Sequence, residues 1–553
     1  MKKIIAIILA SAFAFALLAA CGDRGNTPAP VKNEAFAGGP LEEHLTIVWG
    51  TSGSSGSWVQ PGSMQEKWIN ERYNITLIPW QVDATNAEQT NLKLATGEIF
   101  DFGQIYKGRT DMLDQGLIRP VPMKMIEDAA PTYAQLIRDG GDYVWNASVW
   151  PDSDTDLARL TGYTSTTRGF CWTNGFRLDW MENLGIEPKG PIEELMDGVY
   201  WTEQAFTVEE FTDILYKFTF EDPDGNGVND TYGTSPGNWL HYAWAGHYGA
   251  FGMRSNGGNL NNGGKAVPWY ATEEFKEFCI HISQLVNMGV IDPEAITMDL
   301  DTSWQKFTAG VSGYQTILSS YMDVAYNERP PYSVIVTNPG AKLLITPPTI
   351  GAGGKQQAYQ YTNSFYGYDH YFGKQASDAI VDRVLRIMEE FMTDPEVWVT
   401  FFSGFDGVNF DWAGEAYNSA AIPRDIPNDE KAKYIGGYYP IIYPEAFNKF
   451  MEPFGVTKFK EFSTSAVGLK MTCLNGYTSD VYGEFADETK AHNDLYNADR
   501  ESVREKYWAD VLSGADVSAT WDKYITELKG VGLDEYIELY SKFPKLDDVF
   551  TIK

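Results

Sequence analysis

The chain alternates between short apolar runs and longer stretches in which apolar residues recur at helical spacing. Residues 45–49 and 75–82 have the length and composition of buried strands, and each is followed by a stretch with helical spacing, at 64–73 and 86–95. Strands that alternate with helices in this way predict βαβ units and a mostly parallel sheet. The expected fold class is therefore α/β.

Further helices are predicted by the signals at their ends. Thr207 and Glu210 have the spacing of a capping box, and apolar residues follow Phe211 at i+3, i+4 and i+7 on one face. Another helix begins near Thr272, and Gly289 is a typical stop. Helical periodicity also runs through residues 376–392, 499–512 and 517–528.

The N-terminus has the parts of a secretory signal. Two lysines precede an apolar run over residues 4–20, interrupted only by Ser11. The run is short for a membrane span, and the sequence Leu-Ala-Ala-Cys at 18–21 resembles a bacterial lipobox. We expect residues 1–20 to be a lipoprotein signal peptide and Cys21 to carry lipid (palmitate). A simple membrane anchor or an ordinary secreted protein is the alternative.

The segment after the lipobox differs in composition from the rest of the chain. Residues 21–41 are rich in Gly, Pro, Asn and Ala, which is typical of a flexible tether. A lipid on Cys21 would hold the protein on the extracytoplasmic face of the cell membrane without spanning it.

Charge and cysteine content exclude some classes of protein. The chain of 553 residues has 43 Lys and Arg against 75 Asp and Glu, a net charge of −32. Nucleic-acid binding needs a basic surface and is not expected. With Cys21 lipidated, three of the four cysteines remain and no CxxC spacing occurs. No disulfide framework is predicted, so the fold depends on its core.

An acidic loop at residues 222–233 has the spacing of a calcium site. Asp stands at positions 1, 3 and 9 of the EF-hand pattern, Asn at 5 and Gly at 6, but position 12 is Gly233 instead of Glu. One ligand must then come from elsewhere or from water. The expected ligands of a structural Ca²⁺ are the side chains of Asp222, Asp224, Asn226 and Asp230 and the carbonyl oxygen of Val228. A turn without metal is the alternative.

The sequence contains no complete enzyme motif among those considered below. The GxSxG pattern at 233–237 places Pro236 after the serine, and proline lacks the N–H that an oxyanion hole needs. None of the six histidines has zinc spacing, and no phosphate-binding P-loop occurs. A glycosidase pair among the many carboxylates is not singled out by sequence. We expect a binding protein and not an enzyme.

Several segments, in this order, resemble one family. It is the extracellular solute-binding proteins (family 1) of bacterial ABC importers, in the large lipoprotein branch similar to alginate- and oligosaccharide-binding proteins. The segments that carry the resemblance are the lipobox at Cys21 and residues 91–101, 115–121, 176–185, 218–233 and 285–294. Residues 403–410 match more loosely. The likeness covers about residues 45–415.

The resemblance implies a two-lobe periplasmic-binding-protein-like fold with a hinge and a central ligand cleft. The expected first lobe comprises residues 42–165 and about 310–385. The expected second lobe comprises residues 166–309 and about 386–553, with the calcium loop and the C-terminal helices. The implied protein is a monomer that delivers an oligosaccharide to ABC permease subunits.

Aromatic side chains are the candidate ligand contacts. Aromatics make up 14% of the chain, with 17 Trp; their rings stack on the C–H faces of sugars, while polar groups bind the hydroxyls. The candidates are Trp49, Trp172, Trp239, Trp244, Trp269, Trp304, Tyr321 and Trp412. Core packing is the alternative for each one.

The acidic balance of the chain favours a neutral glycan over a uronate. Two other functions remain open at this stage: a surface hydrolase or lyase acting on glycans, and a receptor for peptides or other solutes with the same fold.

Overall fold

The computed structural model describes most of the chain after residue 40. The described residues are 41–50, 61–80, 82, 87–105, 108–163, 171–238, 240–253, 258–318, 329–357, 365–424, 426–427, 430, 433–434, 440, 461–471, 475–478 and 484–549. The signal peptide, Cys21, the tether to residue 40, Trp239 and Tyr321 lie outside these residues.

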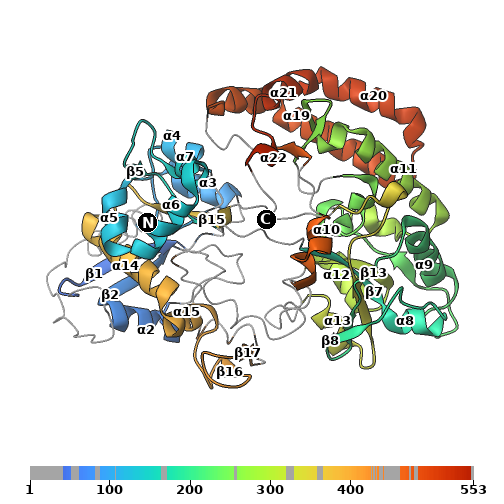
Figure 1. The fold of residues 1–553 in the computed structure, drawn as a ribbon, viewed down its shortest axis with the longest axis horizontal. Coiled ribbons are helices and arrows are strands. Elements are labelled where there is room, and N and C mark those ends of the chain that lie inside the picture. Colours follow the sequence, from blue (N-terminus) through green and yellow to red (C-terminus); the bar gives the residue numbers. More distant parts are fainter. Residues whose placement is uncertain are drawn as a thin grey trace, which may run out of the picture.

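The described elements form two groups that lie side by side in Figure 1, each built on one main sheet. In the first sheet the order is β2-β1-β3-β15-β6. These strands are Ile75–Trp80, Leu45–Gly50, Phe102–Gln104, Phe365–Phe372 and Leu160–Tyr163. We call this sheet and the helices packed on it the first lobe.

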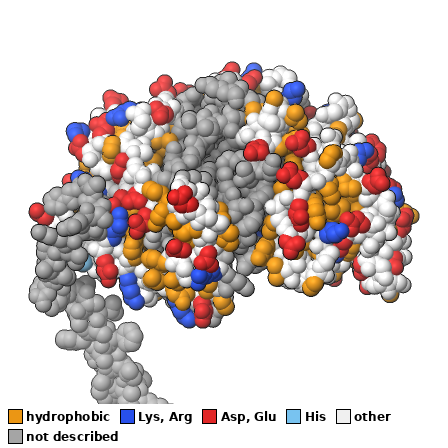
Figure 2. Space-filling model, turned by 60° about the horizontal axis from the view of Figure 1, so that its bottom comes forward, with side chains coloured by type: hydrophobic (Ala, Val, Ile, Leu, Met, Phe, Trp, Pro, Cys, Tyr) orange, Lys and Arg blue, Asp and Glu red, His pale blue; other side chains and the backbone are white. Residues whose placement is uncertain are grey.

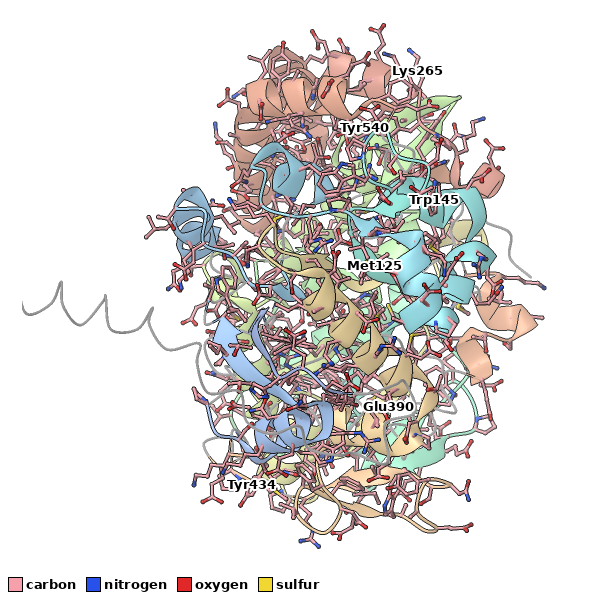
Figure 3. The ribbon with its side chains drawn as sticks, turned by 90° about the vertical axis from the view of Figure 1, so that its left-hand side faces the viewer. Met125, Trp145, Lys265, Glu390, Tyr434 and Tyr540 are labelled. Carbon is pink, nitrogen blue, oxygen red and sulfur yellow. The ribbon has the colours of Figure 1, made fainter. Side chains whose placement is uncertain are left out.

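Helices cover the first sheet and close its core. They are α2 (Met64–Tyr73), α5 (Met123–Ala129), α6 (Pro131–Asp139), α14 (Asp378–Thr393) and α15 (Pro395–Phe402). Apolar residues of β1, α6, α14 and α15 share one buried cluster. Glu390 of α14, labelled in Figure 3, accepts hydrogen bonds from Arg72 Nη2 at 2.8 Å and Tyr73 Oη at 2.6 Å, so the C-terminal part of this lobe is tied to α2.

The second sheet has six strands in the order β10-β13-β7-β14-β9-β8. They are Tyr232–Thr234, Ser312–Leu318, Trp172–Arg177, Leu343–Thr346, Val199–Trp201 and Glu193–Met196. The helices that bury its apolar side chains include α9 (Val208–Phe220), α11 (Glu273–Met288), α19 (Ala486–Leu512), α20 (Val517–Gly530) and α21 (Leu533–Tyr540). We call this group the second lobe.

The predicted helix ends are confirmed where they rested on local chemistry. Thr207 caps α9 with a complete capping box, since its hydroxyl accepts from Glu210 N while the Glu210 carboxylate accepts from Thr207 N. Thr272 caps α11, and Gly289 ends it with φ +81°, a left-handed conformation that glycine adopts without strain. The helix predicted over 499–512 is longer and begins at Ala486.

Sheet direction and lobe boundaries differ from the expectation. Both sheets are mixed, because β15 runs antiparallel to β3 and β6, and β7 runs antiparallel to β13 and β14. These strands are reached by connections that leave the local βαβ succession, so the sequence pattern does not fix their direction. Strands β13 and β14, which we expected in the first lobe, lie in the second sheet. The second half of α14 and all of α15, which we expected in the second lobe, pack in the first core.

Charged side chains are spread over the surface of the described residues. Acidic and basic side chains are interspersed over the face shown in Figure 2. Within the described part of the chain, none of the helices combines the length and the apolar character that a bilayer crossing requires.

Candidate functional site

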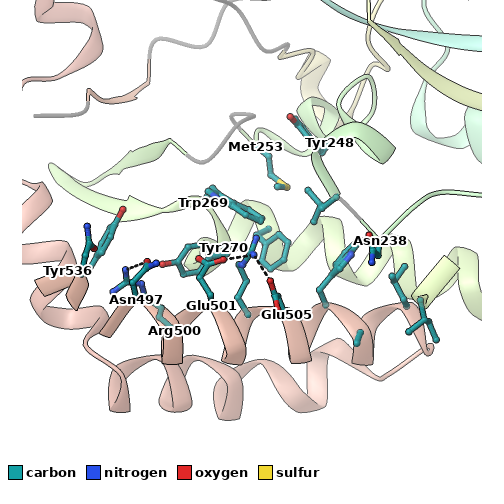
Figure 4. Close-up of a pocket in the computed structure, with 18 of the residues that line it drawn as sticks. Asn238, Tyr248, Met253, Trp269, Tyr270, Asn497, Arg500, Glu501, Glu505 and Tyr536 are labelled. Carbon is teal, nitrogen blue, oxygen red and sulfur yellow. Dashed lines mark hydrogen bonds and ion pairs between the residues drawn. The ribbon is translucent and has the colours of Figure 1, made fainter. Parts of the chain in front are cut away.

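A large cavity lies within the second lobe. It has a volume of about 730 Å³ and is bounded by α19 on one side and by α11 and two short helices, η1 (Tyr248–Phe251) and η2 (Trp269–Ala271), on the other (Figure 4). Its aromatic lining comprises Tyr248, Trp269, Tyr270, Phe275, Trp508, Tyr536 and Tyr540. A cavity of this size with aromatic walls suits a small-molecule or oligomeric ligand.

Packing between helices fixes the aromatic wall. The ring of Phe278 on α11 stacks on Trp508 of α19 at 6.1 Å, and Phe275 contacts Trp269 edge-on at 5.2 Å. Trp269 also meets Tyr270 edge-on at 5.4 Å. The aromatic residues of η2 are therefore held by the same core that seats α19 on α11.

Polar side chains of α19 form the opposite wall. They are Asn493, Asn497, Arg500, Glu501, Arg504 and Glu505, and Asn238 completes the polar lining at the other end of the cavity. Arg504 Nη2 lies 2.5 Å from Glu501 Oε2 and 3.5 Å from Glu505 Oε1, and its guanidinium lies over the Trp269 ring at 5.7 Å. Two carboxylates therefore stand beside the single positive charge of Arg504.

Tyrosine hydroxyls in this region remain protonated. Burial raises the pKa of Tyr270 to about 12, and burial also raises the pKa of Tyr536. The Tyr536 hydroxyl donates to Asn259 Oδ1 at 3.0 Å. The cavity thus presents neutral phenols, amides and charged groups beside aromatic rings, which is the set of groups that binds hydroxylated ligands with apolar faces.

Of the eight predicted ligand contacts, Trp269 lines this cavity. Trp49 and Trp244 are buried in the cores of the first and second lobes, 1% and 0% exposed, so a ligand does not reach them in this structure. Trp172 is buried edge-on against Tyr242 at 4.7 Å, and Trp304 lies under the guanidinium of Arg329 at 5.1 Å.

Trp412 lies in the first lobe on β16 (Phe410–Trp412), against Phe410 at 5.1 Å. Trp239 and Tyr321 are outside the described residues, although the neighbours Asn238 and Leu240 line the cavity. Core packing, the alternative weighed for each tryptophan, therefore accounts for Trp49, Trp172 and Trp244.

Sequence reasoning missed the α19 wall, since the family resemblance ended near residue 415. The signal was present as a helical stripe: Asn493, Asn497, Arg500, Arg504 and Trp508 are spaced by three or four residues and share one face. A stripe of amides, arginines and one tryptophan is an unusual helix face for a pure packing role.

A second, smaller cavity of about 380 Å³ lies between the lobes. Arg109, Thr110 and Asp111 of α4 (Arg109–Asp114) line it from the first lobe, and residues near the start of α19, including Lys490 and Asp494, line it from the second. The helix α19 therefore forms a wall of both cavities, and Asn493 lines both.

The acidic loop follows α9 directly and is folded by hydrogen bonds to its own carboxylates. Asp222 Oδ2 accepts from Gly227 N at 3.0 Å, and Asn226 Nδ2 donates to Asp224 Oδ2 at 2.9 Å and Asp230 Oδ1 at 3.2 Å. Gly227 has φ +84°, as the sharp bend requires. Asp222 Oδ1 is buried and has no hydrogen-bond partner among the described residues.

In the same described residues, no three or more His, Cys, Asp or Glu side chains gather closely enough to form a metal site on their own. The loop is a set of hard oxygen donors with one buried carboxylate oxygen left without a partner.

No protein-family model matches the chain. Among curated proteins, it is similar to the fructooligosaccharide ABC transporter substrate-binding protein FusA of Streptococcus pneumoniae, with 26% identity over 322 residues, 53% of each chain. It is also similar to the lipoprotein LipO of Bacillus subtilis, with 27% identity over 247 residues, which cover 42% of this chain and 41% of LipO. The chain spans about half the length, or less, of these relatives.

Solved structures are similar over nearly the whole chain. FusA in complex with kestose has a TM-score of 0.67 at 16% identity and covers 90% of this chain and 98% of its own. A solute-binding protein from Bifidobacterium longum infantis, described as HMO-binding, has a TM-score of 0.66 at 15% identity. The match covers 92% of this chain and 99% of that protein's chain. An EF-hand mutant of FusA with fructo-nystose has a TM-score of 0.65 at 18% identity. The match covers 90% of this chain and 98% of the mutant's chain.

These likenesses confirm the two-lobe fold expected from the sequence. The curated relatives agree with the resemblance to solute-binding proteins of ABC importers.

Proposed function

We propose that the chain is the substrate-binding lipoprotein of an ABC importer and that it captures an oligosaccharide. The observation that carries the proposal is the cavity itself: aromatic rings of η2, α19 and α21 face amide, guanidinium and carboxylate groups of α19 across about 730 Å³. The similar protein FusA is a fructooligosaccharide substrate-binding protein of an ABC transporter, and the structure of FusA that resembles this fold holds kestose.

In this proposal the ligand is captured because it makes more contacts in one arrangement of the two lobes than in the other. A ligand that touches both lobes stabilises the arrangement in which both contacts exist. In this proposal α19 has the central role, because it lines the large cavity and also faces α4 of the first lobe. Ligand is then handed intact to membrane permease subunits, with lipidated Cys21 holding the protein at the extracytoplasmic membrane face.

We propose in addition that the acidic loop binds a structural Ca²⁺. The donor set is all oxygen, as calcium prefers, and the partnerless Asp222 Oδ1 supplies an oxygen whose burial a cation would compensate. Asp222, Asp224, Asn226, Asp230 and the Val228 carbonyl would hold the ion. Its charge would offset the repulsion between the three carboxylates.

The test is calorimetric titration of the full chain, in calcium, with a panel of oligosaccharides, followed by mass spectrometry of each mixture. We expect saturable binding of at least one glycan, recovered intact. Trp269→Ala removes a ring from the cavity wall and should weaken binding about tenfold, the size of one stacking contact. Trp145→Ala, in the first lobe on α7 (Gly141–Ser148), removes another partly buried ring and should leave the affinity unchanged.

Two other results would replace the proposal. Cleavage of the glycan, lost on mutation of one carboxylate, would identify a hydrolase or lyase. Binding of oligopeptides with no response to any glycan would identify a peptide receptor.

A further inference from the structure

The Asn238 end of the large cavity is built by two segments of the second lobe. The loop after β10 leads to Asn238 and Leu240, and the short helix η3 (Pro293–Ile296) contributes Ile296. Figure 4 shows Asn238 at the opposite end of the cavity from Tyr536. The shape of this end therefore depends on how the loop and η3 are held against each other.

The buried carboxylate of Asp292 joins these two segments. Its side chain is only 2% exposed. Oδ1 accepts a hydrogen bond from Glu294 N of η3 at 3.0 Å, and Oδ2 accepts one from Ser235 Oγ of the loop at 2.9 Å. The backbone N–H of Asp292 also donates to Thr234 O at 3.0 Å. One residue is thus hydrogen-bonded to the loop, to η3 and to the end of β10.

Lys306 of α12 (Leu300–Thr308) balances the charge of this carboxylate. Its Nζ lies 2.7 Å from Asp292 Oδ2 and 2.6 Å from Glu294 Oε2. A buried carboxylate is costly unless it is paired and hydrogen-bonded, so loss of the lysine would leave a charge in a site that holds little water. Turning the carboxylate towards solvent would relieve this cost, and it would release both Ser235 and η3.

Two further hydrogen bonds connect this pair to the cavity wall. Ser303, on the same helix as the lysine, donates through its hydroxyl to Ser235 O at 2.7 Å, and Asn238 N donates to Met298 O at 2.7 Å. Neither member of the pair is among the described residues that line the cavity. The pair can therefore act on a ligand only through the segments that it holds.

We infer that Asp292 and Lys306 are positioning residues for ligand binding, because together they fix Asn238 and Ile296 at one end of the cavity. The inference rests on the function proposed above and adds to it two residues that act without touching the ligand. A purely structural pair would contribute to stability alone, and the affinity of the folded protein would not depend on it.

The first test is the affinity of the folded protein. The full chain and its variants are titrated in calcium with kestose, maltotriose, xylotriose and trigalacturonate, well below the melting temperature of each protein. We expect Lys306→Met to weaken binding about tenfold, which corresponds to about 1.4 kcal/mol. Lys306→Arg keeps the charge and should restore most of the affinity. The matched control is Lys342→Met, which removes a lysine paired with Glu182 at 2.9 Å and should bind as the wild type does.

Hydrogen exchange gives a second test, which needs no ligand. The backbone amides of Asn238 and Asp292 are hydrogen-bonded in the wild type, and opening of these segments exposes them to exchange. In Lys306→Met both amides should exchange about tenfold faster, while the amides of α19 keep their wild-type rates. In Lys306→Arg and Lys342→Met the rates should be those of the wild type. Near-UV circular dichroism establishes that each variant is folded.

The outcomes separate this inference from the proposed function. Wild-type affinity in folded Lys306→Met, or an equal loss of affinity in Lys342→Met, overturns the inference and leaves the proposed function standing. If Lys306→Met does not fold, Ser235→Ala decides, because it removes only one hydrogen bond to Asp292: severalfold weaker binding supports the inference, and unchanged binding contradicts it. A wild type that binds no oligosaccharide overturns the proposed function, and the exchange rate of Asn238 then decides whether the pair holds this end of the cavity.

Discussion

At the residue scale, one buried oxygen of the acidic loop is an informative feature of this chain. Asp222 Oδ1 has no partner among the described residues, although most buried polar atoms in folded proteins do. The other groups of the loop are oxygen donors of the kind that a calcium ion prefers.

The calcium proposal makes a prediction for Asp222. An ion that binds the folded state at a hundred times its dissociation constant adds about 2.7 kcal/mol of stability, so chelation should lower the melting temperature by several degrees. Asp222→Asn should abolish most of this calcium effect. Asp213→Asn, an equal charge change on an exposed residue of α9, should retain it. A melting temperature that does not respond to calcium in the wild type would rule out the site.

Two buried histidines give a prediction for pH. His247 and His281 lie 5.1 Å apart in the second-lobe core; burial lowers the pKa of His281 to about 4, against the pull of Glu209, and burial and His281 lower the pKa of His247. The unfolded state therefore takes up protons below pH 6.5 while the folded state does not. Stability is complete above pH 6.5 and falls as the pH drops towards 4.

For His281 alone, the linkage relation gives a loss of about 2 kcal/mol between pH 7.5 and pH 5. Urea unfolding at both pH values measures the loss in the wild type. In His281→Phe, which keeps an aromatic ring beside Phe251 and removes the proton site, the loss should be smaller by that amount. An identical loss in both proteins would mean that other groups govern the pH dependence.

At the element scale, the ends of helices matter because α9 leads directly into the acidic loop. Thr207→Ala removes the side-chain half of the capping box and should destabilise the protein by about 1 kcal/mol in urea unfolding. Thr212→Ala, at a half-buried position inside the same helix, removes a hydroxyl that bonds back to the Val208 carbonyl. It should be neutral or slightly stabilising, since alanine is the better helix former. Equal destabilisation by both variants would show that the cap contributes nothing specific.

The elements themselves could be predicted where local chemistry decides them. The cap at Thr207, the stop at Gly289 and the first strand at Leu45–Gly50 follow from residues close in sequence. The direction of β15 and the sheet to which β13 belongs could not be predicted, because long crossovers between lobes determine them. Trp269 and Trp244 are equal candidates in the sequence, and only packing separates the one in the cavity wall from the one in the core.

At the scale of the whole molecule, α19 connects ligand binding to the arrangement of the lobes. Its later turns carry Arg500 and Trp508 along the large cavity, and its first turns face α4 across the interlobe cavity. Here Lys490 lies 3.1 Å from Asp494, and its pKa is raised by Asp494 and, across the lobes, by Asp114 and Asp111. A ligand that fixes α19 would therefore also fix an attractive contact between the lobes.

This coupling predicts that reversing the charge of Lys490 impairs closure. In Lys490→Glu the new carboxylate faces Asp111, Asp114 and Asp494, so the closed arrangement is opposed by like charges. We expect ligand affinity to fall severalfold at 20 mM NaCl and to recover at 300 mM, because these groups are exposed and salt screens them. Small-angle scattering should show a smaller ligand-induced decrease in radius of gyration than in the wild type.

The control is Lys523→Glu, an equal charge reversal on α20 beside Glu527, which should change neither the affinity nor the decrease in radius of gyration. If both reversals weaken binding alike, net charge and not the contact between α4 and α19 would be responsible, and lobe closure would have to be stabilised by the ligand alone.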